Sequence, residues 1–224
     1  MKYFFSGKIE KQGNLYCIHL PFNVWEVCKQ RDLINAELLL DNKFVNCELI
    51  PEEKGNYQIQ IKDENVTTNV DTTKVHKLLL HIGGSLIKID QNSPYSIDKP
   101  IRKIDNVDII IQPMDGTCGQ TVVAMLAGVT IAEVCSAMGC REWQATMGLV
   151  ISALNYYGID HSDIIIYTEG EPTTLPKCAV LMEKMGRFCH YLLYFNGKYY
   201  DPNDGVMDDY DQSKLLGYLE IRID

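Results

Sequence analysis

Four side chains in the second half of the sequence are of the types that thiol-dependent acyl transfer needs. Such a reaction uses a cysteine thiolate as nucleophile, an imidazole that generates it, a group that orients the imidazole, and donors for the oxyanion. Cys118 supplies a thiol, His190 an imidazole and Asp201 a carboxylate. Gln112, six residues before the cysteine, supplies a side-chain amide. The sequence therefore contains one candidate for each role.

The predicted position of Cys118 favours a thiolate. The run TCGQTVVAMLAG, 117–128, is apolar and ends on a glycine, as a buried helix does. Cys118 stands where this helix should begin, and the positive end of a helix dipole stabilises a thiolate. Gly119 leaves backbone room for a substrate. Gln112 ends the apolar run DIII, from where its amide could reach back to a developing oxyanion.

The predicted hairpin brings the imidazole and the carboxylate together. His190 begins a strand, and Asp201 ends the next one after the turn FNGK, 195–198. In an antiparallel hairpin closed at Asn196-Gly197, the two positions can lie close to one another. We expect Asp201 to fix the tautomer and orientation of His190.

Each residue also has an ordinary structural interpretation. Cys118 in an apolar helix is commonly a small buried hydrophobe, and His190 is commonly a structural strand residue. Asp201 before a proline is a common turn, and Gln112 before a proline commonly ends a strand. The order and spacing of the four residues together favour the catalytic interpretation.

The first half of the chain is predicted to be a small β domain. Short β-rich runs at 3–10, 14–20, 36–40, 43–50 and 56–62 are separated by turn clusters, which indicates an antiparallel sheet or barrel. A helical turn is predicted at 23–29 and a second helix at 72–80, followed by a closing strand at 83–89. We place this domain at 1–92 and a linker at 93–107, where prolines and charges interrupt any periodicity.

The second half, 108–224, changes character. Thr130 and Glu133 have the spacing of a capping box, which predicts a helix through Met138. A further helix is predicted over 144–157, and strands follow at 164–167, 178–183, 189–195 and 198–201. Helices followed by strands favour the α+β class.

Composition narrows the function further. The chain has 224 residues, with 46% hydrophobic and 23% charged residues, as expected of a folded protein. Its net charge of −9 argues against nucleic acid as a partner. The first residues turn polar by Ser6 and Lys8, and no stretch approaches the length of a membrane span. We therefore expect a cytoplasmic protein without a membrane partner.

The eight cysteines predict neither a disulfide framework nor a metal centre. No CxxC or HxxxH pattern occurs, and Cys135 and Cys140 are too isolated to indicate a zinc site. In a chain of this size without an export signal, we expect mostly free thiols. The sequence predicts no metal and no cofactor.

Two segments carry a resemblance to a known family. QPMDGTCGQTVVAM, 112–125, and HYLLYFNGKYYDPNDG, 190–205, resemble the papain-like cysteine peptidase superfamily, most of all the domains related to bacteriocin-leader-processing peptidases. The resemblance covers about 108–210 and implies a papain-like fold. It implies Cys118 as nucleophile, His190 as general base and acid, Asp201 as orienting residue and Gln112 as oxyanion donor. Asn203 is an alternative orienting residue, since some papain-like enzymes use an amide.

The resemblance predicts cleavage of a peptide or related amide bond in a peptide or protein substrate, without identifying that substrate. The same scaffold also hosts transglutaminase-like acyl or amide transfer, because the acyl-enzyme can pass to an amine. A catalytically silent binding module of the same fold is a third interpretation.

The first half resembles a small bacterial β domain of unknown function. The resemblance rests on HLPFNV, 19–24, and CELIPEEKGNY, 47–57. Such domains resemble small barrels, and Cys17, His19 and Trp25 are assigned to packing. We expect a positioning module that docks a protein partner, covers the cleft or mediates self-association.

Overall fold

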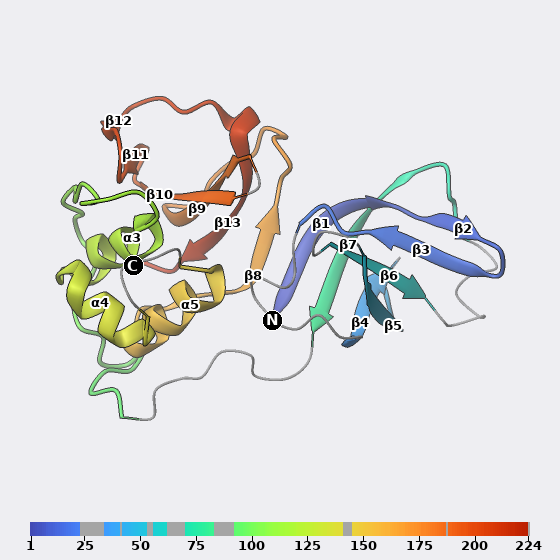
Figure 1. Cartoon of the computed structure of the whole chain (residues 1–224), viewed down its shortest axis with the longest axis horizontal. Helices are drawn as coiled ribbons and strands as arrows, with labels where there is room; N and C mark the ends of the chain where they lie inside the picture. The colour runs from blue at the N-terminus through green and yellow to red at the C-terminus, as the bar shows by residue number, and fades with distance from the viewer. Residues whose placement is uncertain are drawn as a thin grey trace. The chain divides into compact units, whose positions relative to one another are not determined.

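The computed structural model describes residues 1–22, 34–40, 42–52, 56–61, 70–82, 92–140, 145–186 and 188–223 (Figure 1). The helical turn predicted at 23–29, which includes Trp25, and the strand predicted at 83–89 lie outside these residues. Contacts divide the chain into two compact units, Met1–Leu86 with Asp163–Tyr167, and Ile87–Ser162 with Thr168–Asp224.

The predicted α+β class, with a small barrel followed by a papain-like domain, is wrong. The described residues form thirteen strands, and their three α helices are only 8 to 10 residues long. Strands therefore dominate the described part of the chain.

The first unit is a sheet in which neighbouring strands are antiparallel except for one pair. β1 pairs in parallel with the end of β8, a strand from much later in the sequence. The order of strands is β8-β1-β7-β4-β5-β6-β3-β2. Their bounds are β1 Lys2–Lys8, β2 Glu10–Gln12, β3 Leu15–His19, β4 Ile34–Leu40, β5 Lys43–Pro51, β6 Tyr57–Ile61, β7 Val75–Ile82 and β8 His161–Tyr167.

The helix predicted at 72–80 is instead β7. Leu78, Leu80 and Ile82 are buried, whereas Leu79 and His81 between them are half-buried. Burial at every second residue is the period of a strand. The run of leucines favoured a helix in the sequence, but pairing with β1 and β4 fixes the segment as a strand that is buried on one face.

The second unit contains three helices and five antiparallel strands in the order β12-β11-β10-β9-β13. In Figure 1 the helices gather beside β9, β10 and β13. The helices are α3 Cys118–Ala127, α4 Ile131–Met138 and α5 Met147–Tyr156, and the 3-10 helix η2 is Gln212–Lys214. The strands are β9 Cys178–Met185, β10 Phe188–Phe195, β11 Lys198–Asp201, β12 Gly205–Met207 and β13 Leu215–Ile221.

Local sequence signals set the helix ends. Every residue of α3 is buried, and the helix ends at Gly128, whose φ of 68° suits glycine. The predicted capping box of α4 is confirmed, because Thr130 Oγ1 accepts from Glu133 N at 3.3 Å and Glu133 Oε2 accepts from Thr130 N at 2.8 Å. Among the described residues, no single helix is long and apolar enough to cross a membrane, and one bent pair, α3 with α4, passes that test jointly.

A close contact at Gly119 fixes where α3 begins. A Cβ at this position would lie 2.8 Å from the Cβ of Ala145 and 3.2 Å from Cδ2 of Tyr191. Both distances are shorter than ordinary carbon contacts, so only glycine allows α3 to approach β10 this closely. Cys118 precedes Gly119 and His190 precedes Tyr191, so this contact also sets where Cys118 and His190 lie.

We predict that Gly119→Ala lowers the free energy of unfolding by about 1–3 kcal/mol, the usual cost of overpacking a core. Urea denaturation measures the change. Ser136→Ala, at an exposed position of α4, is the control and should stay within about 0.5 kcal/mol of the wild type. Equal stabilities of the Gly119→Ala variant and the wild type would show that the contact is not tight.

Candidate active site

Cys118 is the first residue of α3 and only 8% exposed. The preceding residue, Thr117, does not cap the helix with its side chain, because its Oγ1 donates to Met114 O at 2.9 Å. The Thr117 side chain therefore does not cap the backbone N–H groups of the first helical turn, which lie beside the Cys118 thiol. Their partial positive charge favours a thiolate or another anion at this point.

His190 lies in β10, and Asp201 ends β11. The hairpin between these strands turns at Asn196 and Gly197, whose φ angles of 46° and 87° are both positive, as a tight two-residue turn requires. His190 Nε2 and Asp201 Oδ1 lie 2.8 Å apart, and the two residues are 4% and 5% exposed. The structure thus brings together the pair that the hairpin pattern predicts.

Cys118 lies close enough to His190 to raise the pKa of its imidazole. Because Nε2 is paired with Asp201, the nitrogen left for the thiol is Nδ1. Burial alone lowers the pKa of His190, but the hydrogen bond to Asp201 and the interaction with Cys118, with the negative charges on both, outweigh it and raise the pKa to about 10. At neutral pH the imidazole is therefore protonated, and it lies between two acceptors.

The turn that follows Asp201 also holds its carboxylate, at the same oxygen that pairs with His190. Asn203 N donates to Asp201 Oδ1 at 2.7 Å. Burial raises the pKa of the Asp201 carboxyl, but the hydrogen bonds from His190 and from the backbone of Asn203 and Asp204 prevail and lower it. The carboxylate therefore stays ionised opposite the imidazolium.

Gln112 is hydrogen-bonded to the turn that follows Asp201. Its backbone N donates to Pro202 O at 2.9 Å, and its side-chain Nε2 donates to Asn203 Oδ1. The Asn203 side chain is thus engaged by Gln112, while Asp201 is the residue hydrogen-bonded to His190. Gln112 Oε1 is buried and has no hydrogen-bond partner among the described residues.

Two residues that the sequence analysis did not single out lie near the imidazole. Glu183 of β9 is directly opposite His190 in the register with β10. Tyr210 stacks on Tyr199 of β11 with ring centroids 5.1 Å apart. Burial, and then the negative charges of Glu183 and its acidic neighbours, raise the pKa of Tyr210 far above its ordinary value. No short-range signal marks either residue, because strand pairing and loop packing bring both to the site.

The remaining cysteines and acidic groups do not form a second centre in the described part of the chain. Its seven cysteines are free thiols, and no group of three or more His, Cys, Asp or Glu side chains in these residues could hold a metal ion. In that part of the chain, the Cys118, His190 and Asp201 side chains alone bring together a buried thiol, a buried imidazole and a buried carboxylate.

Comparisons with known proteins give a structural likeness. No family model matches the chain, and a search of curated proteins gives no match. Among solved structures, the chain is similar to the peptidase domain of Streptococcus ComA, a bi-functional ABC transporter involved in a quorum-sensing pathway. That match has 19% sequence identity and a TM-score of 0.42, and it covers 53% of this chain and 100% of the other.

The buried ion pair predicts a specific pH dependence of stability. The pKa of His190 in the folded chain, about 10, is above its ordinary value near 6.5. The contribution of His190 to the free energy of unfolding is therefore complete below about pH 6.5 and is lost as the pH rises through about 10. Asp201→Asn should lower the His190 pKa and remove this part of the pH dependence. NMR titration of the imidazole and urea denaturation at several pH values measure the two effects.

Glu37→Gln is the matched control for this experiment. Glu37 Oε2 lies 3.2 Å from Nδ1 of the more exposed His81, and exposed pairs contribute little to stability. The control should keep the wild-type profile between pH 6.5 and 10. A wild-type profile in Asp201→Asn would show that the carboxylate does not control the charge of His190.

Proposed function

We propose that this chain is a thiol-dependent hydrolase of peptide or related amide bonds, with Cys118 as its nucleophile. The observation that carries the proposal is the buried 2.8 Å pair of His190 and Asp201, with the Cys118 thiol near enough to raise the pKa of the imidazole. A thiol at a helix N-terminus beside a protonated imidazole is the arrangement that makes cysteine reactive. A structural cysteine needs neither partner.

In the proposed reaction, the Cys118 sulfur attacks the carbonyl carbon, and the carbonyl π electrons move onto oxygen. His190 then gives its Nδ1 proton to the departing amine nitrogen as the C–N bond breaks, which leaves a thioester on Cys118. Water next attacks this thioester while His190 takes one of its protons. The C–S bond breaks, the acid is released, and the thiolate and imidazolium are restored.

The oxyanion would be held by the Cys118 backbone N–H and the Gln112 side-chain amide. An amide NH2 group has two hydrogens. Asn203 Oδ1 takes one of them from Gln112 and so fixes the plane of the amide. Because the amide plane is fixed, the direction of the second N–H is fixed as well. Oxyanion stabilisation requires donors that are preorganised in this way. In this proposal Asn203 positions Gln112, and Asp201 orients His190.

The first test is the alkylation rate of Cys118 by iodoacetamide between pH 5 and 9, mapped by mass spectrometry. We expect Cys118 to be labelled selectively at mildly acidic pH, because its partner is an imidazolium. His190→Ala should slow this labelling about tenfold or more. Cys178 is an internal comparison, since burial raises the pKa of its thiol to about 12.

Activity separates hydrolysis from the alternatives. Cys118→Ala should abolish cleavage of peptide substrates, and product should form without an added amine. Product that appears only with a primary amine would instead indicate transfer. Slow labelling of Cys118 that is indifferent to His190 would contradict catalysis and favour a silent binding module.

A double-mutant cycle tests the role of Asn203. Gln112→Ala should lower kcat about 10²-fold or more with little change in KM, as expected for an oxyanion donor. Asn203→Ala should lower kcat less, and the double variant should be no slower than Gln112→Ala. Asn203→Asp, which retains a side-chain oxygen acceptor, should restore part of the loss.

Additive losses in the cycle would contradict coupling between the two amides. A shifted acidic limb of the pH–rate profile in Asn203→Ala would assign Asn203 to His190 and Asp201 instead.

A further inference from the structure

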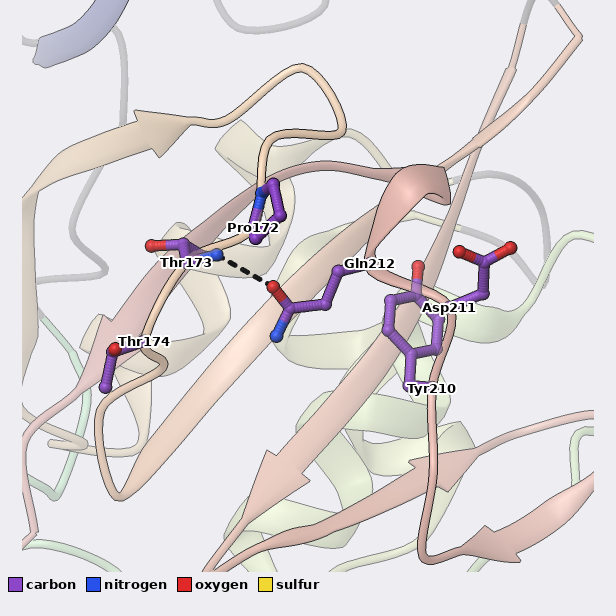
Figure 2. Close-up of a pocket in the computed structure, with 6 residues that line it drawn as sticks. All are labelled: Pro172, Thr173, Thr174, Tyr210, Asp211 and Gln212. Carbon is purple, nitrogen blue, oxygen red and sulfur yellow. Dashed lines mark hydrogen bonds between the residues drawn. The ribbon is translucent and has the colours of Figure 1, made fainter.

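The unit that carries Cys118 also has a wide hollow with a cavity volume of about 600 Å³ (Figure 2). Two loop segments line it, one leading toward β9 and the other leading into β13. The segments are joined by a hydrogen bond from Thr173 N to Gln212 Oε1 at 2.8 Å. The lining residues are Pro172, Thr173, Thr174, Tyr210, Asp211 and Gln212.

Strand register places this hollow near the proposed reaction centre. His190 of β10 is opposite Glu183 of β9, which is in turn opposite Leu215 at the start of β13. Neighbouring strands lie about 4.8 Å apart, so the start of β13 is about 10 Å from His190. Gln212 lies three residues before Leu215, at the start of the 3-10 helix η2, and a 3-10 helix rises about 2.0 Å per residue. The hollow is therefore about 10–16 Å from His190, a distance that an extended peptide covers in about three to five residues.

Tyr210 is a direct link between the hollow and the catalytic strands. Its ring lines the hollow and also stacks on Tyr199, which is two residues before Asp201 on β11. A side chain that occupies the hollow would therefore contact a residue packed on the strand that carries Asp201.

The chemistry of the lining favours a cation. Asp211 is the one charged residue among the six lining residues, and its Oδ1 accepts from Ser213 N and Oγ at 3.1 and 2.7 Å. These hydrogen bonds lower the pKa of Asp211, so it stays ionised. The tyrosine ring offers a face for a cation, and the threonine hydroxyls offer further acceptors. Lys214, the nearest basic residue in sequence, also lowers the pKa of Asp211 through its positive charge, but it does not line the hollow.

We propose that this hollow is a specificity subsite for a lysine or arginine side chain of the substrate, about three to five residues from the scissile carbonyl. The inference rests on the proposed hydrolase function and names a substrate class for it. The aliphatic stem packs on Pro172 and the Tyr210 ring, while the cationic head lies against Asp211. A carboxylate side chain is rejected by the same charge.

The test is cleavage of a mixed peptide library by the full chain, with cleavage sites read by mass spectrometry on both sides of the bond. Lysine and arginine should be enriched about fivefold at one position three to five residues from the cleaved bond. Asp211→Asn should reduce this enrichment to about twofold or less, because it keeps the side-chain oxygen that accepts from Ser213 but removes the charge.

Asp208→Asn is the matched control. It removes the same charge from the same acidic segment, but Asp208 pairs with Lys198 at 3.5 Å and does not line the hollow. Enrichment should persist in this variant. Cleavage without a basic preference, or equal loss in both variants, would overturn the subsite while leaving the hydrolase function intact.

Binding of a single side chain tests the hollow without catalysis. Nα-acetyl-arginine methylamide should shift the backbone amide NMR signals of Thr173 and Thr174 in the wild type and not in Asp211→Asn. The norleucine analogue should leave both signals unmoved. If Cys118 proves unreactive and no peptide is cleaved, the proposed function fails, and the absence of these shifts would overturn the hollow as a cation site as well.

Discussion

The arrangement of the second unit depends on a buried charge pair, the His190 imidazolium and the Asp201 carboxylate. Removing two charges from water costs several kcal/mol each, and their attraction repays this only when hydrogen bonds satisfy both groups. The fold meets that demand from three directions. The β10–β11 hairpin sets the 2.8 Å contact, the Asn203 backbone donates to the carboxylate, and the Cys118 thiol raises the pKa of the imidazole. In the proposed function the same thiol is also the nucleophile.

The same constraint explains why small details of backbone packing matter here. The pair is useful only if the sulfur stays beside Nδ1, and the start of α3 determines its place. Gly119 lets α3 approach Tyr191, the residue after His190, at a distance that any Cβ would prevent. The other end of the site is fixed by backbone too, since Gln112 N is bonded to Pro202 O. Main-chain contacts therefore set the positions, and side chains refine them.

Sequence reasoning succeeded where the signal is local. The helix that begins at Cys118, the capping box of Thr130 and Glu133, and the turn at Asn196-Gly197 are each encoded within a few residues. The fold class was wrong because the extent of strand structure depends on long-range pairing. Leu78 and Leu80 belong to a strand only because β1 and β4 lie on either side. Glu183 and Tyr210 were missed for the same reason, since their nearness to His190 comes from register and packing between distant segments.

In the proposed site, the hollow that binds the basic side chain is distant from the His190 imidazolium. A cation in the hollow would lie about 10 Å or more from the His190 imidazolium. At that separation two unit charges repel by about 0.4 kcal/mol in water, and physiological salt screens over about 8 Å. That repulsion corresponds to about 0.3 units of pKa, far less than the raised pKa of His190 can tolerate. Acidic groups can therefore attract a basic substrate at the hollow without discharging the imidazolium that sustains the thiolate.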